Sequence, residues 1–226
     1  MLEEYFGAKA RKKLTILALT HPSYTKEKGE LDSLENYERL EFFGDSVLKL
    51  FTSKLLYENY PEYSEGKLSK IRSILVSDYT LSKIARQIEL DKLIILGHAE
   101  EKQGGRKRES NLACSLEAIL GAYYLSGKQN AVEQFLFEYL LPYASDIDEH
   151  FEKYNAKDVF QQYTQGIDKT LPVYKTLSMK GPAHSPVFEV ELSWHDDVIA
   201  VCNGKTKKEA QQECAYEACK KFNLVS

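Results

Sequence analysis

The sequence predicts an all-α N-terminal domain followed by a small α+β domain whose elements follow the order α-β-β-β-α. The first observation is that apolar residues recur three and four positions apart from about residue 14 to residue 143, with almost no alternating run. The second is that three short segments rich in β-branched and aromatic residues lie between two helical segments after residue 157. A chain of 226 residues is long enough to bury a core in each of two domains.

The N-terminal domain is assigned to residues 1–145, where the pattern is helical throughout. Pro61, the Gly97-His98 pair and the loop at residues 103–108 interrupt this pattern, because proline and glycine break helices. The clearest helices are predicted at residues 45–60, 68–88 and 111–124.

Residues 146–156 are polar and acidic, and we expect them to form a linker to the second domain, residues 157–226. That domain should open with a short helix and close with a long amphipathic one, which would place Ala210, Cys214 and Ala218 on its inner face. The helices are predicted at residues 158–165 and 207–222, the strands at residues 173–177, 187–192 and 198–201, and the second hairpin turn at residues 194–197.

The composition is that of an ordinary globular protein, with 43% hydrophobic and 28% charged residues. No apolar stretch can span a bilayer and the acidic N-terminus does not resemble a secretory signal, so we expect a cytoplasmic protein without a membrane partner. The four cysteines form no C-x-x-C pair, which indicates reduced thiols. Because the net charge is −4, any binding of nucleic acid must come from a local patch.

Three acids near residue 40 form the most informative pattern of the chain. If this segment is helical, Glu38, Glu41 and Asp45 lie within about 60° of one another on one face. Apolar residues repeat at the same spacing on nearly the opposite face and beyond it, so we expect the helix to be buried on most of its circumference. Buried carboxylates repel one another unless a cation neutralises them, and oxygen ligands suit Mg²⁺ or Mn²⁺.

The alternative for this triplet is a solvated acidic face with partners one helical turn away. Gly44 favours the metal site. A glycine inside a helix costs about 1 kcal/mol and needs a reason, such as the close approach of a ligand or of another backbone.

Two further acids are candidates for the same site. Glu117 is a lone acid in a helix of apolar and small residues. A buried carboxylate needs a partner, which could be a metal shared with the acidic helix or a core arginine. Glu65 stands just before the start of a predicted helix, where a favourable interaction with the helix dipole is the alternative explanation.

A basic and amide-rich set of residues in the second domain predicts binding to double-stranded RNA, read by shape and 2′-hydroxyls. The lysines lie at the start of the last helix, where charge and unpaired backbone N–H groups favour a phosphate. A solvated helix end is the alternative explanation for a charge run of this size. The candidate RNA-binding residues are Gln161, Gln162, Gln165, His184, Lys205, Lys207 and Lys208.

Residues 38–48, Glu-Arg-Leu-Glu-Phe-Phe-Gly-Asp-Ser-Val-Leu, resemble the signature of ribonuclease III, an endonuclease that cleaves double-stranded RNA. The segments at residues 19–24, 68–73 and 116–118 are also similar to that family. The C-terminal domain, including Gly181-Pro182-Ala183-His184, resembles the double-stranded-RNA-binding domain that follows the nuclease domain in bacterial members. The resemblance covers essentially the whole chain, in the domain order of the family.

This resemblance implies an all-α endonuclease domain that hydrolyses phosphodiesters with Mg²⁺, or with Mn²⁺ as the alternative, and leaves 5′-phosphate and 3′-hydroxyl ends. Glu41, Asp45 and Glu117 match the principal metal ligands, and Asp45 and Glu117 are the two most tied to catalysis. Glu38 and Glu65 match acids at the edge of that site. The resemblance also implies a homodimer in which each subunit cuts one strand, and a role in the processing of ribosomal RNA and mRNA.

Cys114 departs from the family pattern, which places an aspartate among the metal ligands three residues before Glu117. A thiol is a poor ligand for Mg²⁺, and the change removes one negative charge. In one interpretation Glu41, Asp45 and Glu117 suffice, with water or Glu38 filling the gap or with Mn²⁺ preferred. In the other the nuclease is impaired and the protein acts as a dimeric binder of duplex RNA. Retention of the other acids favours the first interpretation.

Overall fold

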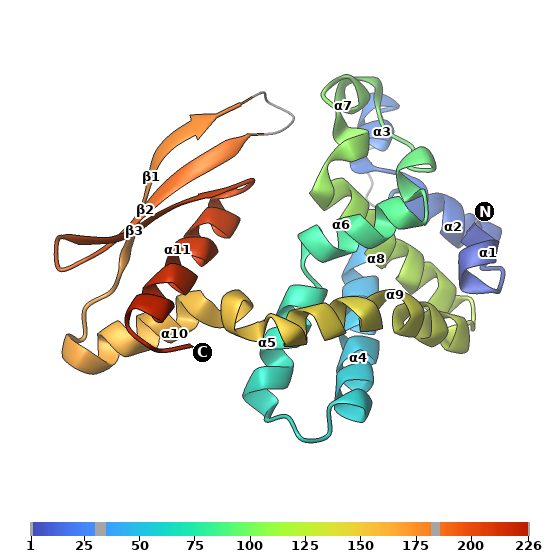
Figure 1. The fold of residues 1–226 in the computed structure, drawn as a ribbon. Helices are drawn as coiled ribbons and strands as arrows, with labels where there is room; N and C mark the ends of the chain where they lie inside the picture. Colours follow the sequence, from blue (N-terminus) through green and yellow to red (C-terminus); the bar gives the residue numbers. More distant parts are fainter. Residues whose placement is uncertain (1, 30–34, 182–185, 226) are drawn as a thin grey trace. The chain divides into compact units, whose positions relative to one another are not determined.

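The computed structural model describes residues 2–29, 35–181 and 186–225, and the chain divides into two compact units. The first unit is Met1–Asp146 and the second is Ile147–Ser226. Figure 1 follows the chain through both of them. Among the described helices, none has an apolar stretch long enough to cross a bilayer.

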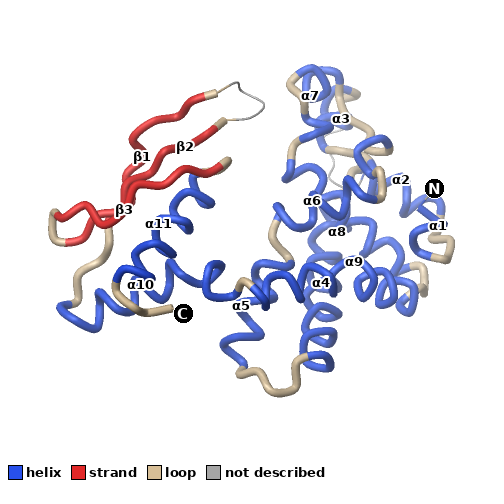
Figure 2. The backbone as a smooth tube through the Cα atoms, in the orientation of Figure 1, coloured by secondary structure: helices blue, strands red, loops and turns tan. Residues whose placement is uncertain are grey.

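The first unit is helical, as predicted, and its one pairing of extended backbone is an isolated parallel bridge between Thr20 and Ile95 within the described residues (Figure 2). Two short 3-10 turns, η2 (Leu90–Lys92) and η3 (Gly105–Lys107), connect helices in its second half. The α-helices are α1 (Leu2–Phe6), α2 (Lys12–Leu19), α3 (Pro22–Glu27), α4 (Glu38–Asn59), α5 (Glu65–Leu75), α6 (Asp78–Gln87), α7 (His98–Lys102), α8 (Glu109–Leu125) and α9 (Gln129–Glu149).

Helix α8 lies at the centre of the first unit and packs against α2, α4 and α6 (Figure 1). From Asn111 to Tyr123 every residue is buried except Cys114 and Glu117, which are partly exposed. A helix that is apolar all round belongs in a core, so these two side chains mark the one place where this part of α8 reaches the surface.

The long helix predicted at residues 68–88 is wrong, because the structure ends α5 at Leu75 and starts α6 at Asp78. The Ser77 hydroxyl donates a hydrogen bond to the carbonyl of Ile74 (2.7 Å) and accepts one from the backbone N–H of Thr80 (3.5 Å). Serine competes with the helical hydrogen bonds and caps the next helix, so this side chain ends one helix and begins another.

Helix α4 is less buried than its apolar residues predicted. Phe42, Leu50 and Tyr57 have exposed fractions of 80%, 59% and 76%. They follow one another at spacings of eight and seven residues, so they share one side of the helix. The expectation that α4 is covered on most of its circumference is therefore wrong for the chain taken alone.

The second unit has the predicted order of one helix, three strands and a final helix. Its strands form one antiparallel sheet in the order β1-β2-β3, and both helices lie over the same face of that sheet (Figure 2). Ala210, Cys214 and Ala218 are fully buried beneath α11, as their spacing predicted. The elements are α10 (Phe151–Asp168), β1 (Val173–Lys180), β2 (Val187–Trp194), β3 (Asp197–Gly204) and α11 (Lys207–Lys221).

The segment predicted as a linker, residues 146–156, is helical on both sides of His150. It contains neither proline nor glycine, so its acidic character alone does not end a helix. The hairpin turn between β2 and β3 is tighter than predicted: it consists of His195 and Asp196, which have φ angles of 53° and 64°. Left-handed residues in a two-residue turn match the twist of the flanking strands.

Candidate functional site

The three acids of the predicted site lie at the start of α4. Asn36 fixes this end of the helix, because its side-chain oxygen accepts the backbone N–H of Glu38 (3.0 Å) and its amide donates to the Thr25 hydroxyl (3.4 Å). Glu38 is exposed, whereas Glu41 and Asp45 are partly buried. The two inner acids therefore face protein on one side and solvent on the other.

Glycines allow α4 and α8 to touch backbone to backbone beside these acids. A Cβ atom on Gly44 would lie 1.8 Å from the backbone oxygen of Glu117. A Cβ atom on Gly121 would lie 2.7 Å from the backbone oxygen of Leu40. The prediction that Gly44 admits a close approach is confirmed, and the group that approaches is the backbone of the residue that carries the fourth acid.

This packing brings Glu117 close to the acids of α4. Burial is the largest cause that raises the pKa of Glu117 to about 8, followed by the negative charges of Asp45 and Glu41. Burial also raises the pKa of Glu41, and Glu38 adds to the effect. Crowded and partly desolvated carboxylates of this kind are typical of sites that hold a cation.

Cys114 lies one helical turn before Glu117 and contacts α4. Its thiol lies close to the carboxylate of Glu41 and to the hydroxyl of the buried Tyr37, and it shifts the pKa of both groups. Burial, followed by the adjacent Glu41 carboxylate, raises the pKa of the thiol well above its usual range. Position 114 therefore carries a neutral hydrogen-bond donor where a carboxylate would be negative.

Asp78 is a member of the acidic cluster that the sequence prediction missed. Its charge contributes to the raised pKa values of Glu41, Cys114 and Glu117. It occupies the first turn of α6, which packs against α8. The sequence signal for it is the Ser77-Asp78 pair, which is typical of a helix start and was hidden inside the predicted single helix.

The structure places the other acids differently. Glu38 lies near Glu41 and Tyr37, at the edge of the cluster. Glu65 lies in the first turn of α5 and accepts a hydrogen bond from the Ser69 hydroxyl (2.6 Å), as the helix-dipole alternative predicts. It is absent from the charges that shift the pKa of Glu41 or Glu117.

The carboxylates have the chemistry of a site for Mg²⁺, since Glu41, Asp45 and Glu117 offer only oxygen donors. Their side chains are turned to other partners: Glu41 to Cys114, and Asp45 to the ammonium group of Lys49 (2.8 Å). Across the described residues no three His, Cys, Asp or Glu side chains converge as metal ligands. The four cysteines are free thiols, as predicted.

The predicted RNA-binding residues are exposed wherever the structure describes them. Gln161, Gln162 and Gln165 share one side of α10. The Thr206 hydroxyl accepts the backbone N–H of Glu209 (3.0 Å), and the Glu209 carboxylate accepts the backbone N–H of Lys205 (2.8 Å). This capping box orders the start of α11 and turns part of its N–H groups away from a phosphate.

The lysine side chains at this end remain available. Lys205, Lys207 and Lys208 are exposed and form no ion pair with any residue the structure describes. His184 lies outside the described residues.

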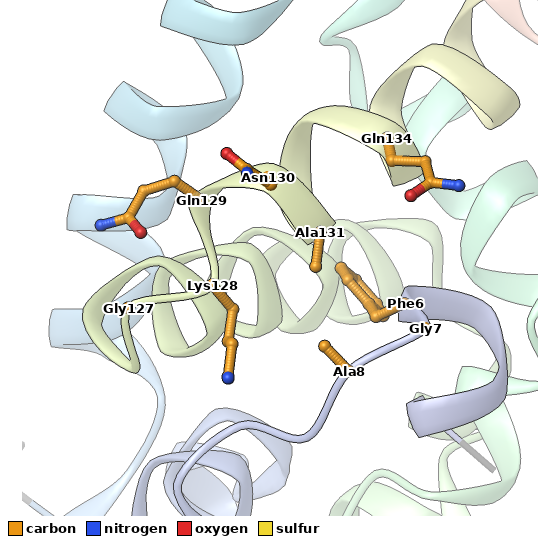
Figure 3. Close-up of a pocket in the computed structure, with 9 residues that line it drawn as sticks. All are labelled: Phe6, Gly7, Ala8, Gly127, Lys128, Gln129, Asn130, Ala131 and Gln134. Atoms are coloured by element: carbon orange, nitrogen blue, oxygen red, sulfur yellow. The ribbon is translucent and has the colours of Figure 1, made fainter.

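A cavity of about 380 Å³ near the N-terminus lies apart from both sets of residues (Figure 3). Figure 3 shows Phe6, Ala8 and Ala131 toward its middle and the amides of Gln129 and Gln134 pointing away from one another. Among the described residues that line it, Lys128 is the only charged one. Its polar groups do not converge, so the acidic cluster on α4 and α8 remains the candidate catalytic site.

Comparison with known families identifies both parts of the chain. Residues 11–144 match the ribonuclease-III-like family model, and residues 156–222 match the model of the double-stranded RNA binding motif. A helical domain with an acidic cluster, joined to this motif, defines the class: an endoribonuclease with a double-stranded-RNA-binding domain.

Similar proteins cover nearly the whole chain. Ribonuclease 3 from Syntrophomonas wolfei is 39% identical over 94% of this chain and 89% of its own length. Ribonuclease 3 from Bacillus licheniformis is 40% identical over 93% of this chain and 84% of its own length. The solved nuclease domain of ribonuclease III from Campylobacter jejuni matches 62% of this chain and 96% of its own, with a TM-score of 0.56 and 36% identity. The chain belongs to the ribonuclease III family.

Proposed function

We propose that this chain cleaves double-stranded RNA by hydrolysing its phosphodiester bonds with a divalent metal, leaving 5′-phosphate and 3′-hydroxyl ends. The observation that carries the proposal is the position of Glu117, which meets Glu41 and Asp45 where α4 and α8 touch. Membership of the ribonuclease III family supports the same chemistry.

Glu41, Asp45 and Glu117 would hold the metal, Mg²⁺ or else Mn²⁺, with Asp45 and Glu117 as the catalytic residues. When bound, the metal supplies a water molecule activated at neutral pH and neutralises charge on the phosphate. Glu117 must lose its proton before it can bind a cation, so metal binding should release a proton below about pH 8. Glu38 and Glu65 would act at the edge of the site.

The second domain would hold the duplex. Three exposed lysines at the start of α11 suit phosphates, and the glutamines of α10 suit the 2′-hydroxyls of a minor groove. We assign residues 1–145 to catalysis, residues 157–226 to RNA binding and residues 146–156 to the connection between them. His184 is retained as an RNA-binding candidate on the strength of the sequence.

We further propose that the working unit is a homodimer in which each subunit cuts one strand. The exposed side of α4 supports this, because Phe42, Leu50 and Tyr57 are large apolar side chains left open to solvent. A solved relative from Campylobacter jejuni is described by flexibility in a region of its nuclease domain that takes part in dimer formation. We also propose that the enzyme acts in the cytoplasm and processes ribosomal RNA and mRNA.

A second function is favoured by Cys114 alone. Its neutral thiol withholds a charge from the metal site, and a protein with too weak a site would bind duplex RNA without cutting it. Retention of Glu41, Asp45 and Glu117 supports the nuclease over this alternative.

One experiment separates the two functions. The purified protein is incubated with a perfect RNA duplex in Mg²⁺ and in Mn²⁺, beside the variants Cys114→Asp, Glu117→Gln and Glu109→Gln. We expect cleavage by the parent, faster cleavage by Cys114→Asp at low Mg²⁺, and a loss of at least about 100-fold in Glu117→Gln. Glu109 is exposed in the first turn of the same helix, so Glu109→Gln should cut like the parent. A parent that binds the duplex but never cuts it, while Cys114→Asp cuts, would establish the binder instead.

A further inference from the structure

A second groove of about 380 Å³ lies on the first unit, between α9 and the end of α6. Among the residues that the structure describes, no member of the acidic cluster and no RNA-binding candidate lines it. Its lining residues are Gln87, Glu138, Tyr139, Pro142, Tyr143 and Asp146.

Pro142 lies inside α9 and shapes this groove. Proline has no N–H, so it cannot donate the helical hydrogen bond to the carbonyl of Glu138, four residues earlier. The exposed Glu138 lines the same groove. Asp146 places a second exposed carboxylate on the same groove.

Two tyrosines form the apolar part of the groove, and neighbouring residues hold both. The Tyr139 ring stacks on the buried Phe135, with centroids 4.7 Å apart and an interplanar angle of 28°. The amide of Gln87 donates to the hydroxyl of Tyr143 (3.3 Å). Both rings are only partly exposed. Because these contacts fix the rings in place, the aromatic surface is preformed.

The carboxylates of Glu138 and Asp146 give the groove a negative charge, and no cation pairs with Glu138 among the described residues. No lysine or arginine lines the groove in the part of the chain the structure describes. Glu138 forms no ion pair with a described residue. A nucleic acid would be repelled here, whereas a cationic side chain with an apolar stem would meet both an aromatic surface and carboxylates.

We propose that this groove binds an arginine side chain from a basic peptide segment of a partner protein. The aliphatic stem packs on Pro142 and Tyr143, and the planar guanidinium donates to the Glu138 carboxylate. Arginine fits better than lysine because its fork of donors can pair with carboxylates while its plane stacks on a ring. The proposal is independent of the proposed cleavage chemistry.

The test measures fluorescence anisotropy of a labelled arginine–glycine heptapeptide with the full chain. A matched peptide carries citrulline, which keeps the shape of arginine and lacks its charge. We expect the arginine peptide to bind at least about fivefold more tightly than the citrulline peptide. Equal affinity for the two peptides would overturn the proposal.

Variants locate the binding site. Glu138→Gln should weaken the arginine peptide about fivefold, whereas Glu62→Gln, an exposed acid in the loop after α4, should leave its affinity unchanged. Tyr143→Phe keeps the ring and should retain binding, and Tyr143→Ala should lose it. If Asp45→Asn weakens the peptide and Glu138→Gln does not, the peptide binds at the catalytic acids and the proposal fails. Cleavage of duplex RNA by Glu138→Gln should equal that of the parent.

Discussion

Glu117 has a pKa of about 8 in the folded chain, raised first by burial and then by the charges of Asp45 and Glu41. In an unfolded chain a glutamate titrates near its ordinary value of about 4.3. Between these two values the folded state holds a proton that the unfolded state has lost. Stability of the metal-free protein therefore falls as the pH rises through this window, and the favourable contribution is complete only below the unfolded value.

Replacement of Glu117 by glutamine should remove this dependence on pH. We expect the Tm of the metal-free parent to fall between about pH 5 and about pH 9, and that of Glu117→Gln to fall less. At the upper end the variant should be the more stable of the two. Thermal unfolding in the presence of a chelator measures this, with Glu109→Gln as the control. Parallel curves for parent and Glu117→Gln would contradict the assignment of the raised pKa.

The residues of the site were predictable to different degrees. Glu41, Asp45 and Gly44 follow from the spacing of one amphipathic helix, because a helical period fixes which side chains share a face. Glu117 follows from the cost of a lone acid among apolar residues. Asp78 was not predicted, since the Ser77-Asp78 pair indicates a helix start but gives no information on whether that end of α6 meets α8. The proximity of Cys114 to Glu41 could not be predicted either, because it depends on the tertiary contact between α8 and α4.

The crossing of α4 and α8 depends on Gly44. In Gly44→Ala the added Cβ would lie 1.8 Å from the backbone oxygen of Glu117, so the two helices must separate. We expect a loss of about 1–3 kcal/mol in the free energy of unfolding. The rate of cleavage should fall by about 100-fold, because a shift of about 1 Å between catalytic groups is enough for such a loss.

Gly66→Ala in α5 is the matched control for this change. A Cβ at Gly66 meets no atom within 4 Å, and the residue is exposed in a helix. Alanine there should stabilise the chain by about 0.5–1 kcal/mol and leave cleavage unchanged. Denaturant unfolding and initial cleavage rates measure both effects. If Gly44→Ala behaved like Gly66→Ala, the backbone contact would not control the site.

The start of α11 should determine the salt dependence of RNA binding. Each lysine that contacts a phosphate releases counterions on binding, so Lys205→Gln, Lys207→Gln or Lys208→Gln should each lower the slope of log affinity against log salt by about 1. Lys221→Gln, at the other end of the same helix, is the control and should leave the slope unchanged. Filter binding of a duplex at several salt concentrations gives the slopes. An unchanged slope in the triple variant Lys205→Gln, Lys207→Gln, Lys208→Gln would remove α11 from the RNA interface.

The elements of the fold were more predictable than their ends. The second domain follows from three segments rich in β-branched and aromatic residues between two helical ones, and the structure confirms its order. The break between α5 and α6 was missed because Ser77 acts through its side-chain hydrogen bonds, which a hydrophobic period does not register. The helical structure on both sides of His150 was missed because acidic residues are compatible with both a linker and a helix.

At the scale of the whole molecule, bulk charge and function point in opposite directions. The chain carries a net charge of −4, which repels RNA at a distance. Residues 157–226 hold nine lysines against nine acids, so the RNA-binding domain is neutral and the excess acid lies in the rest of the chain. Separation of the acids that suit a metal from the lysines that suit phosphates lets one chain provide both kinds of site.

The proposed dimer accounts for the exposed side of α4. Phe42, at 80% exposure, is the most exposed of the large apolar side chains in the described residues. In a symmetric dimer the same surface serves both subunits, so a single change at Phe42 acts twice. Phe42→Glu would bury two unpaired carboxylates in that interface, and charges buried without partners are costly. We therefore expect Phe42→Glu to be a monomer in sedimentation equilibrium at concentrations where the parent is a dimer.

Phe42→Glu should also lose the ability to cut both strands of a duplex, while its RNA-binding domain stays folded. Leu171→Glu, a comparable change at an exposed apolar residue before β1, is the control and should remain a dimer that cuts both strands. Circular dichroism checks that Phe42→Glu remains folded, and gel analysis of a duplex labelled on either strand shows which strands are cut. A folded Phe42→Glu that still sediments as a dimer would place the interface elsewhere and leave the exposed side of α4 for another partner.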